Sequence, residues 1–203
     1  MNKELKKDFI ADVALTCFLS SGYAGASVDD IVRAAGISKG GLYWHFKSKE
    51  DIFLYLIEKW ITGYERELVS RFSGQGSAGN KLGRFVEYYL ETADVAVITL
   101  IKEFLMQAKD EAILNKLQDL IEHSKTLSLI ENVILEAVHK GENKPLDVEA
   151  AAYAFLGLFE GIRSLWFISK QDKSLLERLA RTGLNIYLDG VLKNSDNTFI
   201  PSN

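Results

Sequence analysis

Residues 31–51 constrain the fold of this chain most, because they predict two short helices on either side of a tight glycine turn. Residues 30–35 can form the first helix, and Gly36 follows at the position after a helix where a left-handed backbone costs least. Ser27 can cap this first helix in a Ser-x-x-Asp arrangement, and Ser38 can cap a second helix that runs to about Phe46. This order of helix, glycine turn and capped helix predicts a helix-turn-helix, a motif that places its second helix in the major groove of DNA.

The two faces of the predicted second helix differ in chemistry. Leu42 and Phe46 stand at helical spacing, so both side chains should point to the interior. The opposite face carries Lys39, Gly40, Tyr43, Trp44 and Lys47. Lysines and aromatic side chains with polar atoms suit a groove lined by phosphates, and glycines permit close approach of the backbone. A surface aromatic patch for a protein partner is the alternative interpretation of Tyr43 and Trp44.

Segment 26–51 resembles the DNA-binding signature of the tetracycline-repressor (TetR) family. The resemblance rests on Gly36-Ile37-Ser38, then Leu42-Tyr43-Trp44-His45-Phe46, then Lys49-Glu50. Hydrophobic, turn and basic positions agree in the right order throughout this segment. The rest of the chain resembles the family only in length and all-helical pattern. The resemblance implies a bacterial transcriptional repressor that binds a near-palindromic operator as a dimer and is released by a small-molecule effector.

The resemblance also assigns residues to the DNA interface. The candidate set is Ser27, Val28, Arg33, Ser38, Lys39, Gly40, Gly41, Tyr43, Trp44, His45, Lys47 and Lys49. Phosphates are assigned to Ser27, the backbone N–H of Val28, Tyr43, His45 and Lys49, and base edges to Lys39, Gly40 and Gly41. Relatives often carry side chains at positions 40 and 41, and two glycines cannot make bidentate base contacts. Direct readout should therefore rest on Lys39, with help from Arg33 and from DNA shape.

Charge and composition are compatible with this class. The net charge is −4, but the first 50 residues hold seven Lys/Arg against six Asp/Glu, and the rest hold 17 against 22. An acidic body behind a weakly basic head would orient the head toward DNA. Residues 1–8 are charged and polar with no apolar run behind them, so we expect a cytoplasmic protein without a signal peptide.

Other classes of protein find little support in the sequence. The three histidines, His45, His123 and His139, form no evident metal cluster, and neither a nucleophile elbow nor a dinucleotide fingerprint is evident. We therefore expect no enzymatic activity, no metal site and no cofactor. The class that stays open beside a DNA-binding regulator is a helical adaptor that binds protein through its aromatic surface.

Apolar residues recur at helical spacing along most of the chain, which carries only two prolines. We expect an all-α fold of about nine helices, over residues 3–21, 30–35, 39–46, 49–71, 81–94, 95–109, 111–139, 148–169 and 173–192. The glycine- and serine-rich run 73–80 predicts a flexible linker. The expected domains are a helix-turn-helix DNA-binding domain over 1–48, a connecting helix over 49–72, the linker over 73–80, and a ligand-binding and dimerisation domain over 81–203.

Segment 148–169 is apolar almost all round, so we expect it to be buried on two sides. A membrane span is the alternative, but Glu149, Glu160 and Arg163 would be costly near the centre of a bilayer. A second copy of the chain explains the segment better, because one helix-turn-helix reads only half an operator. In the family the last two long helices form the dimer interface, which assigns the homodimer contact here to 148–169 and 173–192.

Large aromatic residues of the body predict where an effector binds. The candidate set is Trp60, Tyr64, Phe85, Tyr88, Tyr89, Glu103, Phe104, Phe159, Arg163 and Trp166. We expect most of these side chains to belong to the core and a minority to line a cavity. Buried Tyr and Trp need polar partners, so we expect a mostly apolar pocket with a few polar anchors. The expected effector is a hydrophobic or aromatic small molecule, with a cation favoured by the acidic body.

Overall fold

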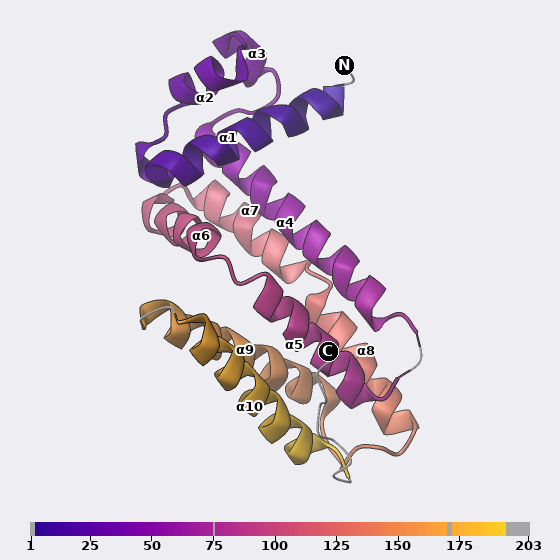
Figure 1. Cartoon of the computed structure of the whole chain (residues 1–203). Coiled ribbons are helices and arrows are strands. Elements are labelled where there is room, and N and C mark those ends of the chain that lie inside the picture. The colour runs from indigo at the N-terminus through magenta and orange to yellow at the C-terminus, as the bar shows by residue number, and fades with distance from the viewer. Residues whose placement is uncertain (1–2, 75, 170–171, 194–203) are drawn as a thin grey trace. The chain divides into compact units, whose positions relative to one another are not determined.

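The computed structural model describes residues 3–74, 76–169 and 172–193 (Figure 1). The helices there are α1 Lys3–Gly25, α2 Val28–Ala35, α3 Lys39–Tyr43, α4 Lys49–Phe72, α5 Ala78–Glu91, α6 Val95–Gln107, α7 Glu111–Glu122, α8 Thr126–His139, α9 Val148–Ile168 and α10 Lys173–Val191. Within these ranges, strand-like pairing is limited to an isolated bridge between Asn143 and Leu192. The predicted all-α fold is confirmed. Residues 1–2 of the predicted DNA-binding domain, Gln75 of the predicted linker, and residues 170–171 and 194–203 of the predicted C-terminal domain lie outside the described residues.

One predicted helix is two helices, and another begins earlier than expected. The expected helix 111–139 is interrupted between α7 and α8, where the backbone N–H of Lys125 donates to Glu65 Oε1 at 2.5 Å. Five consecutive polar residues, 122–126, coincide with this break, a local signal that the prediction of one continuous helix overlooked. α5 begins inside the predicted linker, because Ser77 Oγ accepts a hydrogen bond from the backbone N–H of Asn80 and caps the helix.

The described residues group into two compact units. The first contains residues 3–63 and 94–124, and the second contains 64–93 and 125–193. α4 contributes residues to both units, and the chain passes from the first to the second again between α7 and α8. α6 and α7 therefore group with the helix-turn-helix, although the predicted domains follow the order of the chain. Those domain boundaries are functional assignments and stay a prediction.

The first unit has an aromatic core. The rings of Phe18, Tyr23, Phe53 and Phe104 lie 4.8–5.5 Å apart between centroids and are at most 1% exposed. Each such ring buries about 150–250 Å² of surface, so this group dominates the stability of the unit. α1, α4 and α6 supply these four rings, and α6 packs directly on α1.

Gly22 breaks α1 where the sequence predicts its end, although one further helical turn follows. Its backbone has φ +74° and ψ 163°, a conformation that L side chains rarely adopt. The break frees the backbone N–H of Tyr23, which donates to Glu103 Oε2 at 2.7 Å. A Cβ atom at Gly22 would lie 2.9 Å from the same oxygen. Glycine is therefore needed here both for its backbone conformation and for the approach of Glu103.

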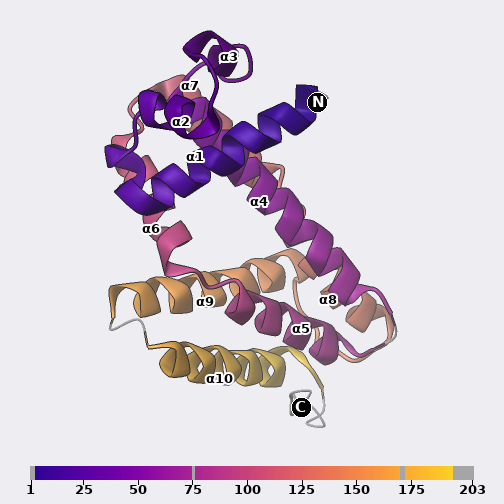
Figure 2. The ribbon, with the colours of Figure 1, turned by 45° about the horizontal axis from the view of Figure 1, so that its top comes forward.

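The second unit is built around α9, which packs on α8 and α10 (Figure 2). α5 also packs on α8 and α10, so these four helices share one core. The hydroxyl of Tyr89 donates to the carbonyl of Phe159 at 2.8 Å, and that of Tyr187 donates to Ala151 at 2.8 Å. Both buried hydroxyls therefore satisfy a backbone carbonyl as well as filling space.

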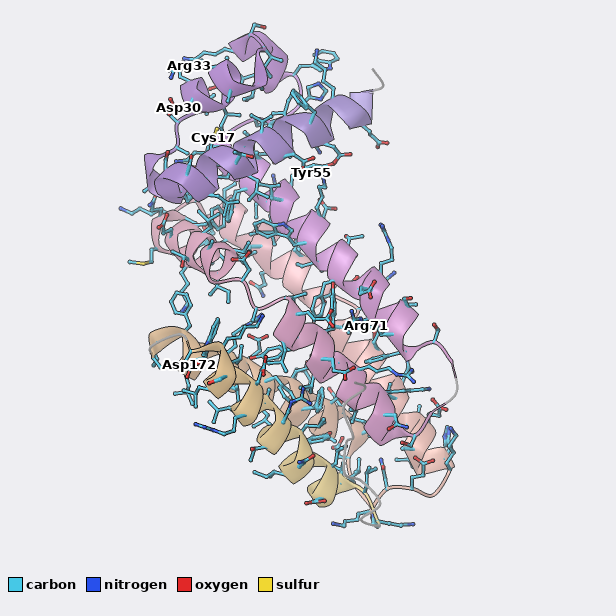
Figure 3. All side chains as sticks on the ribbon, viewed as in Figure 1. Cys17, Asp30, Arg33, Tyr55, Arg71 and Asp172 are labelled. Atoms are coloured by element: carbon cyan, nitrogen blue, oxygen red, sulfur yellow. The ribbon has the colours of Figure 1, made fainter. Side chains whose placement is uncertain are left out.

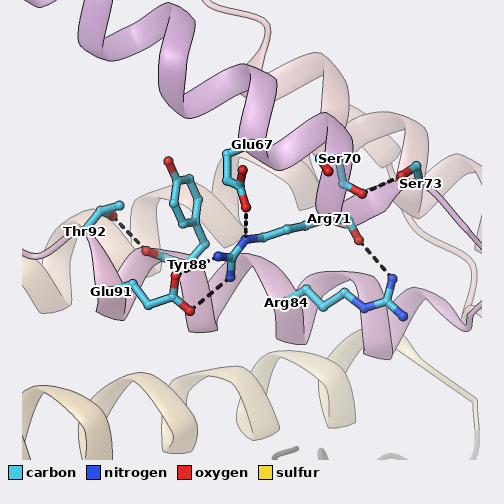
Figure 4. A network of polar contacts seen from close by, with 8 residues as sticks. All are labelled: Glu67, Ser70, Arg71, Ser73, Arg84, Tyr88, Glu91 and Thr92. Atoms are coloured by element: carbon cyan, nitrogen blue, oxygen red, sulfur yellow. Dashed lines mark hydrogen bonds and ion pairs between the residues drawn. The ribbon is translucent and has the colours of Figure 1, made fainter.

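Arg71 joins the end of α4 to α5 within the second unit (Figure 4). Its guanidinium donates to Glu67 Oε1 at 2.9 Å and to Glu91 Oε2 at 2.7 Å, and lies 4.5 Å from the ring centroid of Tyr88. Arg84 donates in turn to the backbone carbonyl of Arg71 at 2.9 Å. The two carboxylates, Glu91 foremost, raise the pKa of Arg71 above its ordinary value. This network fixes α4 against α5 next to the predicted linker.

Candidate nucleic-acid interface

The first helix of the helix-turn-helix begins with a capping box. Ser27 Oγ accepts from the backbone N–H of Asp30 at 3.1 Å, and Asp30 Oδ2 accepts from the backbone N–H of Ser27 at 3.1 Å. Two N–H groups at the start of α2 are thereby satisfied, which fixes where the helix begins. The predicted Ser27 cap is confirmed, and α2 begins directly after it at Val28, two residues before the expected range 30–35.

The turn between α2 and α3 depends on Gly36, as predicted. Its backbone is left-handed, with φ 63° and ψ 33°, and its N–H donates to the carbonyl of Arg33 at 3.3 Å. Ser38 then caps α3 by accepting from the backbone N–H of Gly41 at 3.1 Å. α3 ends before Phe46, the predicted end, although the N–H of Phe46 still donates to Leu42 at 3.0 Å.

α3 presents one face to the core and the other to solvent. Leu42 is 0% exposed and Phe46 is 1% exposed, which confirms that both point inward. On the other side Tyr43 is 50% exposed and Trp44 is 73% exposed. The exposed members of the predicted DNA-contact set are Ser27, Arg33, Ser38, Lys39, Gly40, Tyr43, Trp44 and Lys47, and the half-buried members are Val28, Gly41, His45 and Lys49.

Two carboxylates on α2 pair with the cations predicted to read bases. The sequence alone did not identify these two carboxylates as partners. Lys39 Nζ lies 2.8 Å from Asp29 Oδ1, and Arg33 Nη1 lies 3.4 Å from Asp30 Oδ1. Figure 3 labels Asp30 and Arg33 on this helix. The hydrogen bond that the Lys39 ammonium donates to Asp29 raises the pKa of Lys39. Adjacent aspartates in the first turn of a helix are ordinary partners of its N-terminus, so the sequence alone does not distinguish this second role.

Lys49 lies differently from its predicted role as a phosphate contact. Its Nζ donates to the carbonyls of Tyr23 at 2.9 Å and Ala26 at 3.2 Å, and it lies 4.4 Å from the ring centroid of Tyr23. An ammonium group has three donors, so two are already engaged at the end of α1. The structure gives Lys49 a role in joining α4 to α1, and phosphate binding by it stays a prediction.

Three predicted effector residues belong to the first unit. Phe104 is fully buried in the aromatic core, and Glu103 accepts the hydrogen bond from Tyr23 described above. Trp60 packs with an edge-on ring against Phe53, at 6.1 Å between centroids. These contacts occupy the three side chains inside the unit that carries the helix-turn-helix, so none of them needs a ligand to be satisfied.

The other predicted effector residues belong to the second unit, and most of them contact one another. Tyr64 stacks on Tyr88 at 4.8 Å, and Phe85 lies 5.9 Å from Phe159 between ring centroids. Burial raises the pKa of Tyr64 and of Tyr89 well above the ordinary value. Arg163 pairs with Glu160, and its guanidinium lies 5.9 Å from the Tyr89 ring. Trp166 stands apart, because its indole N–H donates to the carbonyl of Asp172, the N-cap residue of α10, at 2.9 Å.

Comparison with known proteins gives matches along the chain. The profile described as "Bacterial regulatory proteins, tetR family" matches residues 10–56, and "QacR-like protein, C-terminal region" matches residues 53–193. The HTH-type transcriptional regulator QacR of Staphylococcus aureus is 27% identical over 193 residues, covering 92% of this chain and 98% of QacR.

Solved structures show the same fold. FadR of Bacillus subtilis in complex with stearoyl-CoA superposes with a TM-score of 0.73 at 21% identity, covering 90% of this chain and 97% of FadR. SmeT, the repressor of the Stenotrophomonas maltophilia multidrug efflux pump SmeDEF, gives 0.74 at 20% identity, covering 97% of this chain and 94% of SmeT. SmeT has also been solved as a triclosan complex, with a TM-score of 0.75.

Proposed function

Because the chain belongs to the tetR family of bacterial regulatory proteins, we propose that it is a cytoplasmic repressor whose homodimer releases its operator when a small molecule binds. Family membership makes the chain a DNA-binding transcriptional regulator, which confirms that prediction over the helical adaptor. The observation that carries the proposal is the outward face of α3, where Lys39 and Tyr43 are exposed on a helix anchored by Leu42 and followed by the exposed Trp44. The relatives described are regulators, and the absence of enzymatic activity in this chain stays a prediction.

α3 is proposed to enter the major groove with Lys39 directed to base edges. Tyr43 and His45 bind phosphates on the flanking strand, and the backbone N–H of Val28 does so at the start of α2, where the helix dipole favours an anion. Phosphate contacts fix the register of the head, and base contacts choose the sequence. The two kinds of contact can therefore be separated by mutation.

Tyr43→Ala is expected to weaken binding to all duplexes by a similar factor, whereas Lys39→Ala should also relax base preference. A good base contact is worth about 1–3 kcal/mol of discrimination, or roughly five- to 150-fold. The measurement is selection of operators from a random duplex pool, followed by titration of the selected operator and its single-base variants. Circular dichroism would establish that each variant is folded. Unchanged operator affinity and base preference in both variants would show that α3 does not enter the major groove.

The dimer contact is proposed to lie on the uncovered face of α9, with α10 beside it. A stripe of exposed positions, Tyr153, Gly157, Gly161, Leu165 and Ile168, runs along α9 opposite the buried Phe155 and Phe159. A Cβ atom at either glycine would meet nothing within 4 Å in this chain, so a second backbone can approach there. α10 adds Ile186, which is 67% exposed. Interfaces of permanent homodimers commonly bury about 2,000 Å² or more and are rich in apolar side chains, as this face is.

α9 is also the one helix among the described residues that is long and apolar enough to cross a membrane, with 28% of that stretch buried in a single chain. Its buried face nevertheless packs on α8 and α10, and it falls inside the region matched by the QacR-like profile. A partner copy explains the uncovered face without a bilayer. The proposal therefore places α9 in the homodimer rather than in a membrane.

The effector is proposed to bind at the aromatic group of the second unit, Tyr64, Phe85, Tyr88, Tyr89 and Phe159. Two of its rings already lie near guanidinium groups, Tyr88 near Arg71 and Tyr89 near Arg163. Rings whose faces receive the chain's own cations can receive a cation from outside. This supports a hydrophobic or aromatic molecule with a positive charge as the effector class.

A hydrophobic cation from a small screen is expected to raise the melting temperature and to release the operator. A tenfold loss of operator affinity requires about 1.4 kcal/mol of coupling between the two sites. Tyr64→Leu should remove both effects, whereas Trp60→Leu, which changes an aromatic residue of the other unit, should retain both. The measurements are thermal shift and operator titration with and without the compound. Compounds that stabilise the protein but never change operator affinity would show that the protein binds ligands without any effect of the ligand on DNA binding.

A further inference from the structure

We propose that Asp29 is a positioning residue for base readout, holding the Lys39 ammonium where it meets the edges of the bases. This inference rests on the proposed function, because it concerns how α3 reads DNA. Asp29 stands in the first turn of α2, and its Oδ1 lies 2.8 Å from Lys39 Nζ at the start of α3. The ion pair therefore links the helix that precedes the turn to the residue proposed to choose the sequence.

Asp29 is the main polar partner of Lys39, and Tyr43, one turn along α3, makes a smaller electrostatic contribution. The two residues that follow Lys39, Gly40 and Gly41, offer no side chain against which its methylene stem could pack. A lysine side chain carries its ammonium on a flexible four-carbon stem and loses much rotamer freedom when it is fixed. Its side chain is 58% exposed, so without Asp29 the ammonium could contact several base pairs or a phosphate with similar ease.

The neighbouring aspartate cannot replace Asp29 in this role. Asp30 accepts from both the backbone N–H and the hydroxyl of Ser27, and these hydrogen bonds lower its pKa. Asp30 also forms an ion pair with Arg33 on its own helix. Asp29 is thus the carboxylate of this pair that bridges α2 to α3.

The Asp29 carboxylate should also weaken DNA binding in general, and this effect can be measured separately from base preference. A negative charge on the groove-facing side weakens the general attraction to phosphates whatever the sequence. Removing it should therefore leave binding to non-specific duplexes equal or stronger while discrimination between bases falls. A purely electrostatic role would change affinity for all sequences alike.

The test compares wild type, Asp29→Ala, Lys39→Ala and the double variant on a selected operator and its single-base variants. Lys39→Ala should lose about five- to 150-fold discrimination at the base pairs it reads. Asp29→Ala should lose about two- to fivefold at the same base pairs, the range expected for an exposed ion pair. Asp29→Asn, which retains an acceptor oxygen, should fall between wild type and Asp29→Ala. In the Lys39→Ala background the Asp29 change should have no further effect on preference.

Glu58→Gln on α4 is the matched control, because Glu58 is exposed in the same unit and its change removes one negative charge. It should leave base preference unchanged. If Asp29→Ala keeps full discrimination between bases while Lys39→Ala loses it, Asp29 has no positioning role, and Lys39 reads the bases without it. If Lys39→Ala also keeps full discrimination, or no variant including wild type selects an operator, the proposed readout itself fails and the inference fails with it.

Discussion

Leu165→Glu is expected to convert the homodimer into a monomer and to lower operator affinity by about a hundredfold or more. Leu165 is 61% exposed in the single chain, so the change should not disturb folding of the protomer. In the proposed interface the new carboxylate would be buried without a partner, which costs about 3–5 kcal/mol, and symmetry places it there twice. A monomer presents one α3 and can read only one half of a palindromic operator. Light scattering at micromolar concentration and operator titration measure the two effects.

Leu135→Glu provides a matched control for this result. Leu135 is 40% exposed on α8, so the same chemical change is made in the same unit but outside the proposed stripe. This variant should remain a dimer with unchanged operator affinity. A Leu165→Glu protein that remains dimeric and binds its operator fully would show that α9 does not form the interface.

The helix-turn-helix could be predicted from sequence because its signals are local. Ser27, Gly36 and Ser38 act on backbone groups no more than four residues away, so residue type and spacing carry the information. Leu42 and Phe46 follow from helical periodicity for the same reason. The break between α7 and α8 also has a local signal, the polar run 122–126, which the prediction of one continuous helix overlooked.

The contacts that sequence reasoning missed join residues far apart in the chain. Glu103 accepts from the backbone N–H of Tyr23 across 80 positions, which gives a residue expected near the effector a contact with α1. Lys49 similarly donates to carbonyls 23 and 26 positions earlier. The Asp29–Lys39 pair spans the turn and requires the angle between α2 and α3 to be known. None of these partners is marked by periodicity or spacing.

Gly40→Ala is expected to stabilise the protein while weakening operator binding about tenfold, and Gly40→Leu should weaken it further. A Cβ atom at Gly40 would meet only Ser38 Oγ, at 4.0 Å, so the fold has room for a side chain there. Replacing a helical glycine by alanine contributes about 0.5–1 kcal/mol to stability at a compatible site. Gly40 nevertheless lies exposed beside Lys39 on the face proposed to enter the groove, where a side chain would hold the backbone away from the base edges. The free energy of unfolding, measured by chemical denaturation, should therefore rise, while operator affinity, measured by titration, should fall.

Gly63→Ala separates the general gain in helix stability from the effect on DNA. Gly63 lies on α4, and a Cβ atom there would meet nothing within 4 Å. This variant should gain stability like Gly40→Ala but bind the operator as wild type does. Gly41 differs from both, because a Cβ atom there would lie 3.3 Å from Ser38 Oγ, so its substitution should disturb the cap of α3 as well. If Gly40→Ala is stabilised and binds the operator with undiminished affinity, close approach at position 40 is not needed, and the absence of a side chain there has another cause.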